Sequence, residues 1–373
     1  MRVWHFLSGD LWAGAEVMAC TLLKGLRSHS EISPAVLLLN EGRLAEELRG
    51  SGLPVVVLEE RRRPFLALVR EARRILCADP PDLIHAHRYK ENILAFLASR
   101  PGRPVPLVAT QHGLPETRGT GMAGRLTARA NTLLLARSYS QVVAVSSNIR
   151  QDYFRQRGIP AARSRVIHNG IELPQPEPPP LHSRPVLGSV GRLTPVKDYP
   201  LLVAVAREMK CADALVDFRL AGSGPERATI EGMVAASKLD TVFTLAGEVA
   251  DISGFYRQLD IYLCTSQHEG LPLSMLEAMA HGLPVVAPDV GGLRDLVSHG
   301  TDGFLLDSRD PRAFAEVCLR LVRDTQLRQR MGLAARAKVA GRFSAALMTA
   351  SYARLYREMS GAPCPAKGEV DNA

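Results

Sequence analysis

Residues 266–282 read Ser-Gln-His-Glu-Gly-Leu-Pro-Leu-Ser-Met-Leu-Glu-Ala-Met-Ala-His-Gly, and this stretch decides the fold. An apolar run at Ile261–Cys264 precedes it and predicts a buried strand, and a second apolar run follows at Pro284–Ala287. Between them, Leu273–Ala280 has apolar residues at helical spacing, and Pro272 suits the first helical turn. A strand, a helix and a second strand in this order are typical of a parallel α/β sheet.

The loop before this helix carries the chemistry of the stretch. Glu269 and Gly270 lie in the turn where the predicted helix begins, and Glu277 follows about two turns later. Free backbone N–H groups and the positive end of the helix dipole favour an anion at such a position. Carboxylates would repel a bare phosphate, so we expect them to bind the hydroxyls of a sugar or ribose. The stretch therefore suggests a nucleotide-sugar pocket.

Strands and helices alternate through both halves of the chain. Short apolar runs separated by helical patterns predict strands at residues 2–7, 35–39, 55–58, 83–86, 107–110 and 142–145, and again at 186–190, 218–221, 242–246 and 303–306. Such alternation indicates two doubly wound α/β domains. The Pro-rich segment Pro174–Pro180 suits neither a helix nor a central strand, and it predicts a linker between the domains.

Length and composition describe an ordinary globular protein. The 373 residues are enough for two domains that each bury a core, and no run of eighteen apolar residues predicts a membrane span. Six cysteines are scattered without a C-x-x-C pair, so buried free thiols in a reducing compartment are expected. These features predict a cytoplasmic location and no metal cluster.

The net charge of +8 is unevenly distributed. Residues 1–170 carry 24 Lys and Arg against 14 Asp and Glu, whereas residues 171–373 carry 22 against 24. A basic first half favours an anionic partner, and a membrane surface is preferred because no nucleic-acid-binding motif accompanies the charge. The basic segment Arg61–Arg74 is interpreted as a surface helix that packs Leu66 and Val69 inward, with membrane contact as the alternative.

Two cations lie in the loop after the predicted strand 186–190. Arg192 and Lys197 could together neutralise a diphosphate, whereas the alternative is a role in surface salt bridges. Gly222 follows the predicted strand 218–221 and would let backbone approach a ligand. A comparable glycine loop with Gly14 follows the first strand, although it lacks the G-x-G-x-x-G fingerprint of dinucleotide sites.

These motifs resemble a known family. The run H-E-G-L-P-L-S-M-L-E-A-M-A-H-G-L-P-V-V, with seven residues between its two glutamates, is similar to the signature of the retaining glycosyltransferases of family 4. The run G-R-L-T-P-V-K-D at 191–198 matches a second family motif, and W-A-G-A-E at 12–16 resembles its G-G-A-E loop. The resemblance implies an α/β fold of the GT-B architecture, in which two doubly wound Rossmann-like domains face each other across a cleft.

The resemblance also assigns roles to individual residues. Glu269 and His112, which stands in T-Q-H-G at the end of a predicted strand, are the expected catalytic residues. His87 and Lys90 are acceptor-side candidates. The expected donor-binding residues are Gly14, Arg192, Lys197, Gly222, Glu248, Val249, Gly270, Leu271, Leu273, Ser274 and Glu277.

The implied activity is transfer of a hexose-type sugar, with retention, from a nucleoside diphosphate sugar to a glycan or lipid-linked acceptor. UDP is the favoured donor base, although no residue distinguishes uracil from guanine. No cofactor or metal is expected, because Arg192 and Lys197 supply positive charge and the chain contains no D-x-D triplet. Cell-envelope or exopolysaccharide synthesis is the expected setting, with the protein peripheral on the inner face of the membrane.

Two alternatives remain beside this activity. One is a UDP-sugar 2-epimerase of the same fold, and the other is a non-catalytic scaffold that binds nucleotide sugars. The predicted domain limits are 1–172 for the acceptor-side domain, 173–185 for the linker, 186–344 for the nucleotide-sugar domain, 345–360 for a helix that returns to the first domain, and 361–373 for a disordered tail.

Overall fold

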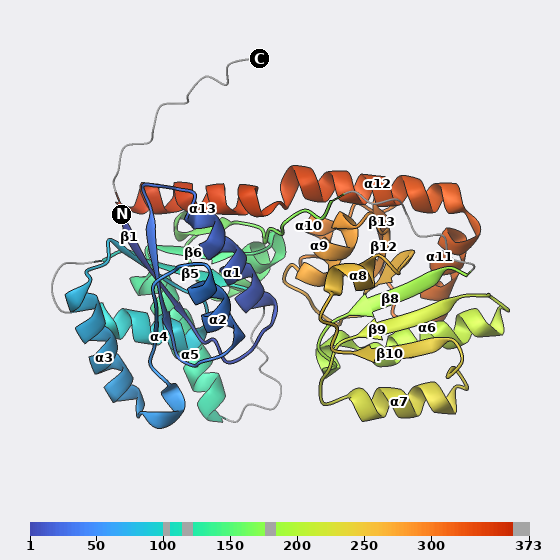
Figure 1. Cartoon of the computed structure of the whole chain (residues 1–373), viewed down its shortest axis with the longest axis horizontal. Helices are drawn as coiled ribbons and strands as arrows, with labels where there is room; N and C mark the ends of the chain where they lie inside the picture. Colours follow the sequence, from blue (N-terminus) through green and yellow to red (C-terminus); the bar gives the residue numbers. More distant parts are fainter. Residues whose placement is uncertain (100–104, 114–121, 176–183, 361–373) are drawn as a thin grey trace, which may run out of the picture. The chain divides into compact units, whose positions relative to one another are not determined.

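A computed structural model describes residues 1–99, 105–113, 122–175 and 184–360. The chain forms two compact units, and it passes between them after Gly170 and again after Ser344 (Figure 1). The first unit contains Met1–Gly170 together with the chain from Ala345 onward, and the second contains Ile171–Ser344. The middle of the predicted linker, residues 176–183, and the predicted tail, residues 361–373, lie outside the described residues.

The first unit is built on a parallel sheet of seven strands in the order β3-β2-β1-β4-β5-β6-β7. The strands are β1 (Arg2–Leu7), β2 (Ser33–Leu38), β3 (Val55–Val57), β4 (Leu83–Ala86), β5 (Leu107–Gln111), β6 (Gln141–Ala144) and β7 (Ser164–Val166). The helices are α1 (Gly14–Leu26), α2 (Arg43–Gly50), α3 (Phe65–Ala78), α4 (Tyr89–Ala98), α5 (Met122–Ser138) and α13 (Ala345–Ser360). Three short helical segments, η1 (Glu60–Arg62), η2 (Ile149–Phe154) and η3 (Ala161–Arg163), complete it.

The central strands of this sheet are apolar because helices cover both of their faces. α1 packs against α2 and α13, whereas α4 packs against α3 and α5, so two groups of helices enclose the sheet. α13 anchors its end of the chain to this unit through Tyr352 and Tyr356, whose side chains are fully buried. The six strands predicted here are confirmed within a residue or two at their ends. β7 was not predicted, because it is a three-residue strand at the sheet edge with an arginine at its centre.

The second unit has a parallel sheet of six strands in the order β10-β9-β8-β11-β12-β13. The strands are β8 (Val186–Val190), β9 (Asp217–Ala221), β10 (Phe243–Gly247), β11 (Ile261–Leu263), β12 (Val285–Pro288) and β13 (Gly303–Leu306). The helical elements are η4 (Pro195–Lys197), α6 (Tyr199–Cys211), α7 (Arg227–Ala236), α8 (Ile252–Tyr256), α9 (Leu273–Ala280), α10 (Leu293–Leu296), α11 (Pro311–Arg323) and α12 (Thr325–Arg342). α6 packs against α7 and α11, and α9 packs against α12.

Strand order in the second unit determines where a ligand binds. From β8 the chain builds outward to β9 and β10, and it then returns to place β11 on the other side of β8. The loops after β8 and β11 therefore diverge at neighbouring positions. This switch point is where doubly wound sheets bind their ligands.

Two local predictions were wrong. Pro272 is the N-cap of α9 with extended backbone, so it precedes the helix and is not part of its first turn. Leu66 does not pack inward: it is 74% exposed, and the buried face of α3 is formed by Leu68, Val69, Ala72 and Leu76. Leu66 is only the second residue of α3, so it lies in the first turn, ahead of the buried residues. Among the described residues, no helix is long and apolar enough to cross a membrane.

Candidate active site

An ion pair lies at the switch point of the second unit. Lys197, the last residue of η4 after β8, places Nζ 2.6 Å from Oε1 of Glu269, which follows β11. The hydroxyl of Ser266 donates to the same oxygen over 2.6 Å. The two charged side chains are only 22% and 12% exposed, so both are partly removed from water. Within the described residues no hydrogen bond reaches Oε2 of Glu269, so this oxygen is available to a ligand.

The electrostatics of the pair favour a charged Lys197. Burial disfavours an ammonium group, but the adjacent Glu269 carboxylate outweighs this effect and holds the pKa of Lys197 above its usual value. Arg192, in the same loop, is exposed and forms no ion pair with any described residue. The loop therefore presents one cation that is already paired and one that is open to an incoming anion.

Backbone and side-chain hydrogen bonds hold the two loops together. The hydroxyl of Thr265 donates to the carbonyl of Lys197 over 2.9 Å, and the N–H of Gln267 donates to the carbonyl of Val196 over 2.8 Å. Arg309, just after β13, donates to the carbonyls of Thr265 and Ser266 and forms an ion pair with Asp198. Arg309 was not among the site residues predicted from the sequence. Its position beyond the end of a strand was the only feature that could have marked it as one.

Two glycines let the backbones of the site approach closely. Gly222, at φ +138°, lies against Gly191, where a Cβ atom would be 1.9 Å from the Gly191 carbonyl oxygen. A Cβ atom at Gly291, whose φ is +54°, would likewise overlap the carbonyl oxygen of Glu269. We interpreted Gly222 from the sequence as a residue that lets a ligand approach, but the structure shows that packing between loops already requires it.

Glu277 does not lie on a solvated helix face. Its Oε2 accepts a hydrogen bond of 2.9 Å from the hydroxyl of Tyr256, a residue with no exposed surface. Burial raises the pKa of Glu277, and the hydrogen bond from Tyr256 opposes that rise. A carboxyl group in this setting gains by accepting a further hydrogen bond from a ligand hydroxyl.

Most of the remaining donor-site candidates would contact a donor through their backbone groups and not through their side chains. Leu271 and Leu273 are buried, and Gly270 lies between them and Glu269. α9 has no side-chain cap, so the first N–H groups of this helix point out of it without a capping partner. Glu248 is exposed and accepts a hydrogen bond from Ser223, whereas the neighbouring Val249 is half-buried.

The first unit contains the other four predicted site residues. Gly14 is the first residue of α1, is exposed, and has no atom within 4 Å of where a Cβ would lie. Lys90 is exposed and forms an ion pair with Glu60. His87 and His112 follow β4 and β5, and Nδ1 of His87 lies 3.2 Å from Nε2 of His112. His87 is buried, and its acceptor-side role stays a prediction.

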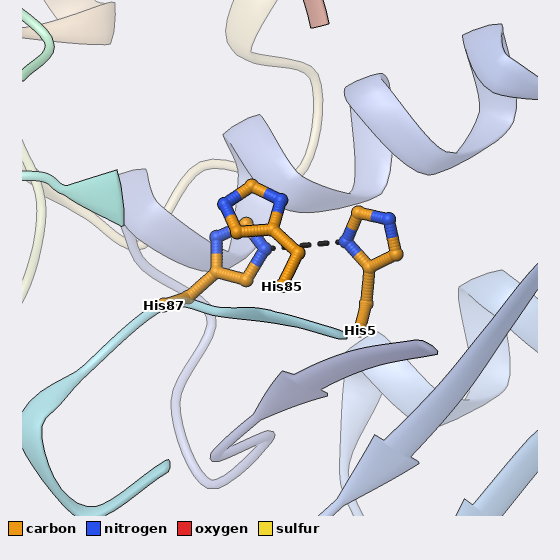
Figure 2. Close-up of side chains that lie close together, drawn as sticks. All are labelled: His5, His85 and His87. Atoms are coloured by element: carbon orange, nitrogen blue, oxygen red, sulfur yellow. Dashed lines mark hydrogen bonds between the residues drawn. The ribbon is translucent and has the colours of Figure 1, made fainter. Parts of the chain in front are cut away.

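Two further histidines complete a buried cluster that the sequence analysis did not assemble. Nδ1 of His5, on β1, lies 3.3 Å from Nε2 of His87, and Figure 2 shows these two rings with His85 beside them. His85 uses both ring nitrogens elsewhere: Nδ1 with the Tyr356 hydroxyl at 2.6 Å, and Nε2 with the Thr110 hydroxyl at 2.8 Å. Alternation along β4 could have suggested that His85 and His87 share a face, but nothing in the sequence links them to His5.

Comparison with protein families identifies both halves of the chain. Residues 12–175 match the family described as Glycosyltransferase Family 4, and residues 174–338 match Glycosyl transferases group 1. The chain belongs to the group 1 glycosyltransferases of family 4. The second match contains every member of the ion-pair site at the switch point, including Arg309.

Relatives of this glycosyltransferase act on several substrates. A GDP-mannose-dependent alpha-mannosyltransferase of Mycobacterium tuberculosis is 30% identical over 64% of this chain and 60% of that enzyme. A D-inositol 3-phosphate glycosyltransferase of Frankia alni is 28% identical over 70% of each chain. HepE of Anabaena, solved in complex with UDP, has a TM-score of 0.81 at 24% identity, over 96% of this chain and all of HepE. This likeness establishes the GT-B class of fold.

Replacing Gly222 by alanine should destabilise the glycosyltransferase by about 2 kcal/mol or more, because the residue has positive φ and its Cβ would overlap the Gly191 carbonyl. Gly232→Ala, within α7 and with open space around its Cα, is the matched control and should stabilise by about 0.5–1 kcal/mol. Urea unfolding measures both. Equal stability of the two variants would contradict the packing role of Gly222.

The buried histidines should make stability depend on pH. Burial lowers the pKa of His5 and that of His112 from 6.5 to about 3, so the folded chain keeps both neutral where the unfolded chain binds protons. Their contribution is complete above pH 6.5 and is lost as pH falls toward 3, at about 1.4 kcal/mol per pH unit for each histidine. His5→Phe should therefore make the loss of stability between pH 6.5 and pH 5 less steep in urea unfolding. An unchanged slope would show that His5 is not held neutral.

Proposed function

We propose that this glycosyltransferase moves a hexose-type sugar from a nucleoside diphosphate to a glycan or lipid-linked acceptor, with retention and without a metal ion. The observation that carries the proposal is the Lys197–Glu269 pair at the switch point, with Arg192 unpaired in the same loop. Two cations and a helix N-terminus at this edge of the sheet fit the diphosphate of a nucleotide sugar, and the carboxylates of Glu269 and Glu277 fit the hydroxyls of its sugar and of its ribose.

The proposed catalysis follows from where charge develops. When the bond between the anomeric carbon and the diphosphate breaks, negative charge grows on the leaving oxygens and positive character grows on the sugar ring. Lys197, Arg192 and the first N–H groups of α9 would stabilise the leaving diphosphate. These fixed positive groups supply what a divalent cation supplies in other transferases, which supports the proposal that no metal is required.

The carboxylates take the hydroxyl-bearing parts of the donor in this proposal. Glu269 already accepts two hydrogen bonds at Oε1, and Oε2 would accept one from a sugar hydroxyl, which fixes the anomeric carbon for attack. Glu277, on α9 and held by Tyr256, would accept a hydrogen bond from the ribose. His112 and the exposed Gly14 are assigned to the donor sugar and the donor phosphates by the family resemblance.

The base of the donor is proposed to be uracil, with guanine as the competing choice. HepE has been solved in complex with UDP and with UDP-glucose, and the mycobacterial relative is named for its dependence on GDP-mannose. Both donors present the same diphosphate to Lys197 and Arg192. Base preference therefore depends on other residues, among which the loop at Glu248 and Val249 is the candidate.

A peripheral position on an anionic membrane surface at the inner face of the cell membrane is also proposed, in keeping with a lipid-linked acceptor of envelope or exopolysaccharide synthesis. Phe65 and Leu66, at the start of α3, are 40% and 74% exposed, and Arg61, Arg62 and Arg63 directly precede them. Exposed apolar side chains beside clustered arginines suit insertion between anionic headgroups.

Glu269→Gln should lower kcat/KM for sugar transfer or donor hydrolysis roughly a hundredfold or more, because it removes the charge opposite the developing positive sugar. Glu231→Gln, an exposed glutamate on α7, is the matched control and should behave as wild type. Reactions with UDP-glucose and with GDP-mannose are followed by NMR in the presence of EDTA, so that the anomeric configuration of the product is read directly.

Each contrary result overturns a named part of the proposal. Wild-type rates for Glu269→Gln would remove its catalytic role. Formation of an epimerised nucleotide sugar without transfer would replace the function by epimerisation. An inverted product would remove retention, and activity that returns only with Mg²⁺ or Mn²⁺ would remove metal independence.

Membrane contact predicts that the protein sediments with vesicles containing phosphatidylglycerol and is released as ionic strength rises. Leu66→Ser should weaken this binding about threefold or more, because one large apolar side chain contributes about 1 kcal/mol or more when buried. Leu215→Ser, at a residue 70% exposed in the second unit, is the control and should leave binding unchanged. Equal loss in both variants, or binding that salt does not alter, would contradict the assignment.

A further inference from the structure

Two buried imidazoles, those of His5 and His87, and the half-buried imidazole of His112 form one continuous chain of hydrogen bonds in the first unit. Nδ1 of His5 lies 3.3 Å from Nε2 of His87, and Nδ1 of His87 lies 3.2 Å from Nε2 of His112. The rings come from β1 and from the carboxyl ends of β4 and β5, which are neighbouring strands. The outermost nitrogens of this hydrogen-bonded series are Nε2 of His5 and Nδ1 of His112. Both atoms are buried and have no hydrogen-bond partner among the described residues.

All three rings are neutral in this setting. No carboxylate of a described residue is hydrogen-bonded to any of them, and burial lowers the pKa of each well below its usual value. Arg88 also disfavours an imidazolium at His87 and at His112, and its guanidinium is 2.5 Å from the Glu16 carboxylate. The hydroxyls of Tyr352 and Tyr356 on α13 are bonded to Thr110 and His85.

Neutrality makes the tautomers of the three rings depend on one another. A neutral imidazole has one N–H and one bare nitrogen, and each hydrogen bond needs one of each. If His87 carries its proton on Nε2, it donates to His5, and its bare Nδ1 must accept from Nε2–H of His112. If it carries the proton on Nδ1, both hydrogen bonds reverse. In either case all three histidines have the same tautomer.

We propose that His5 and His87 are positioning residues that fix whether Nδ1 of His112 donates to or accepts from a hydroxyl of the donor sugar. The proposal rests on the function proposed above, which assigns His112 to the donor. Reversing the hydrogen bonds in either direction would require a proton to leave or to reach Nε2 of His5, and that buried atom has no hydrogen-bond partner among the described residues. The hydrogen bonds among the three histidines therefore keep one donor-to-acceptor direction during the reaction. They orient His112 and do not relay protons.

A metal ion is the competing occupant of this cluster, because ring nitrogens of His5, His85 and His87 lie within 4.8 Å of one another. Hydrogen bonding argues against it, since both nitrogens of His85 are held by hydroxyls. Three neutral ligands would also leave a divalent charge uncompensated in a fully buried place. Zinc binding is therefore an outcome of the test and not the proposal.

The first experiment reads the tautomers directly. Long-range ¹H–¹⁵N spectra of the full chain labelled with ¹⁵N-histidine distinguish protonated from bare ring nitrogens, and single variants assign the signals. We expect His5, His87 and His112 to share one tautomer at pH 7, and we expect one equivalent of Zn²⁺ to leave their signals in place. Mixed tautomers, a charged ring, or stoichiometric zinc shifts on His5, His85 and His87 would each overturn the proposal.

The second experiment separates positioning from structure. His5→Phe should lower kcat for hydrolysis or transfer of the accepted donor, UDP-glucose or GDP-mannose, roughly tenfold to a hundredfold, with UDP or GDP affinity unchanged. His5→Gln keeps an amide that can bond to His87 and should restore much of the rate. His29→Phe, at a histidine outside the cluster, is the control and should match wild type.

The outcomes distinguish the two proposals. Equal rates for wild type and His5→Phe, or the same loss in His5→Gln as in His5→Phe, would overturn the positioning role. A wild-type protein that turns over neither donor would overturn the proposed function, whereas the spectra would still decide whether the three rings share a tautomer.

Discussion

The ion pair between Lys197 and Glu269 is the interaction on which the second unit depends. The two residues lie 72 positions apart, on loops that leave neighbouring strands at the point where strand order reverses. Bringing two charges into a site where each is less than a quarter exposed costs hydration free energy. That cost is offset by short hydrogen bonds, by the Ser266 hydroxyl on Glu269, and by the Arg309 contacts that tie the loops together.

The geometry of the surrounding loops follows from the need to hold this pair. Gly222 and Gly291 allow carbonyl oxygens of the site to approach other backbone, which no side chain at these positions would permit. The result is a preorganised arrangement. A donor diphosphate would take the place of Glu269 as the partner of Lys197, and Glu269 would keep a free oxygen for the sugar. In the first unit, hydrogen bonds among buried histidines hold His112 in the same preorganised manner.

Much of this could be predicted from sequence, because local patterns decide local structure. The helix Leu273–Ala280 was predicted to the residue, because its apolar spacing and its flanking strands are compatible with only one assignment. Short motifs at strand ends also singled out Lys197 and Glu269, which the structure joins in an ion pair, whereas their donor-binding role stays a prediction. Leu66 was misjudged because the pattern gave helical spacing without the position at which α3 begins, and Leu66 lies in the first turn, ahead of the buried residues.

Contacts between distant segments could not be predicted in the same way. Arg309, His5 and the tyrosines of α13 act on residues that are 43 to 271 positions away, and no local pattern marks such partners. The register of parallel strands brings His5 beside His85, and a single sequence does not reveal that register. Burial of His87 likewise depends on this packing and could not be predicted from its position at a strand end.

One measurement tests the central claim that the Lys197–Glu269 site binds the diphosphate of the donor. Calorimetric titration compares UDP, GDP and ADP with uridine, guanosine and adenosine, for wild type and for Lys197→Met. The account predicts that one diphosphate binds wild type, that the variant weakens it roughly tenfold or more, and that the matching nucleoside binds both proteins equally. Equal affinity of the diphosphate for wild type and variant, or no binding of any diphosphate, would contradict it.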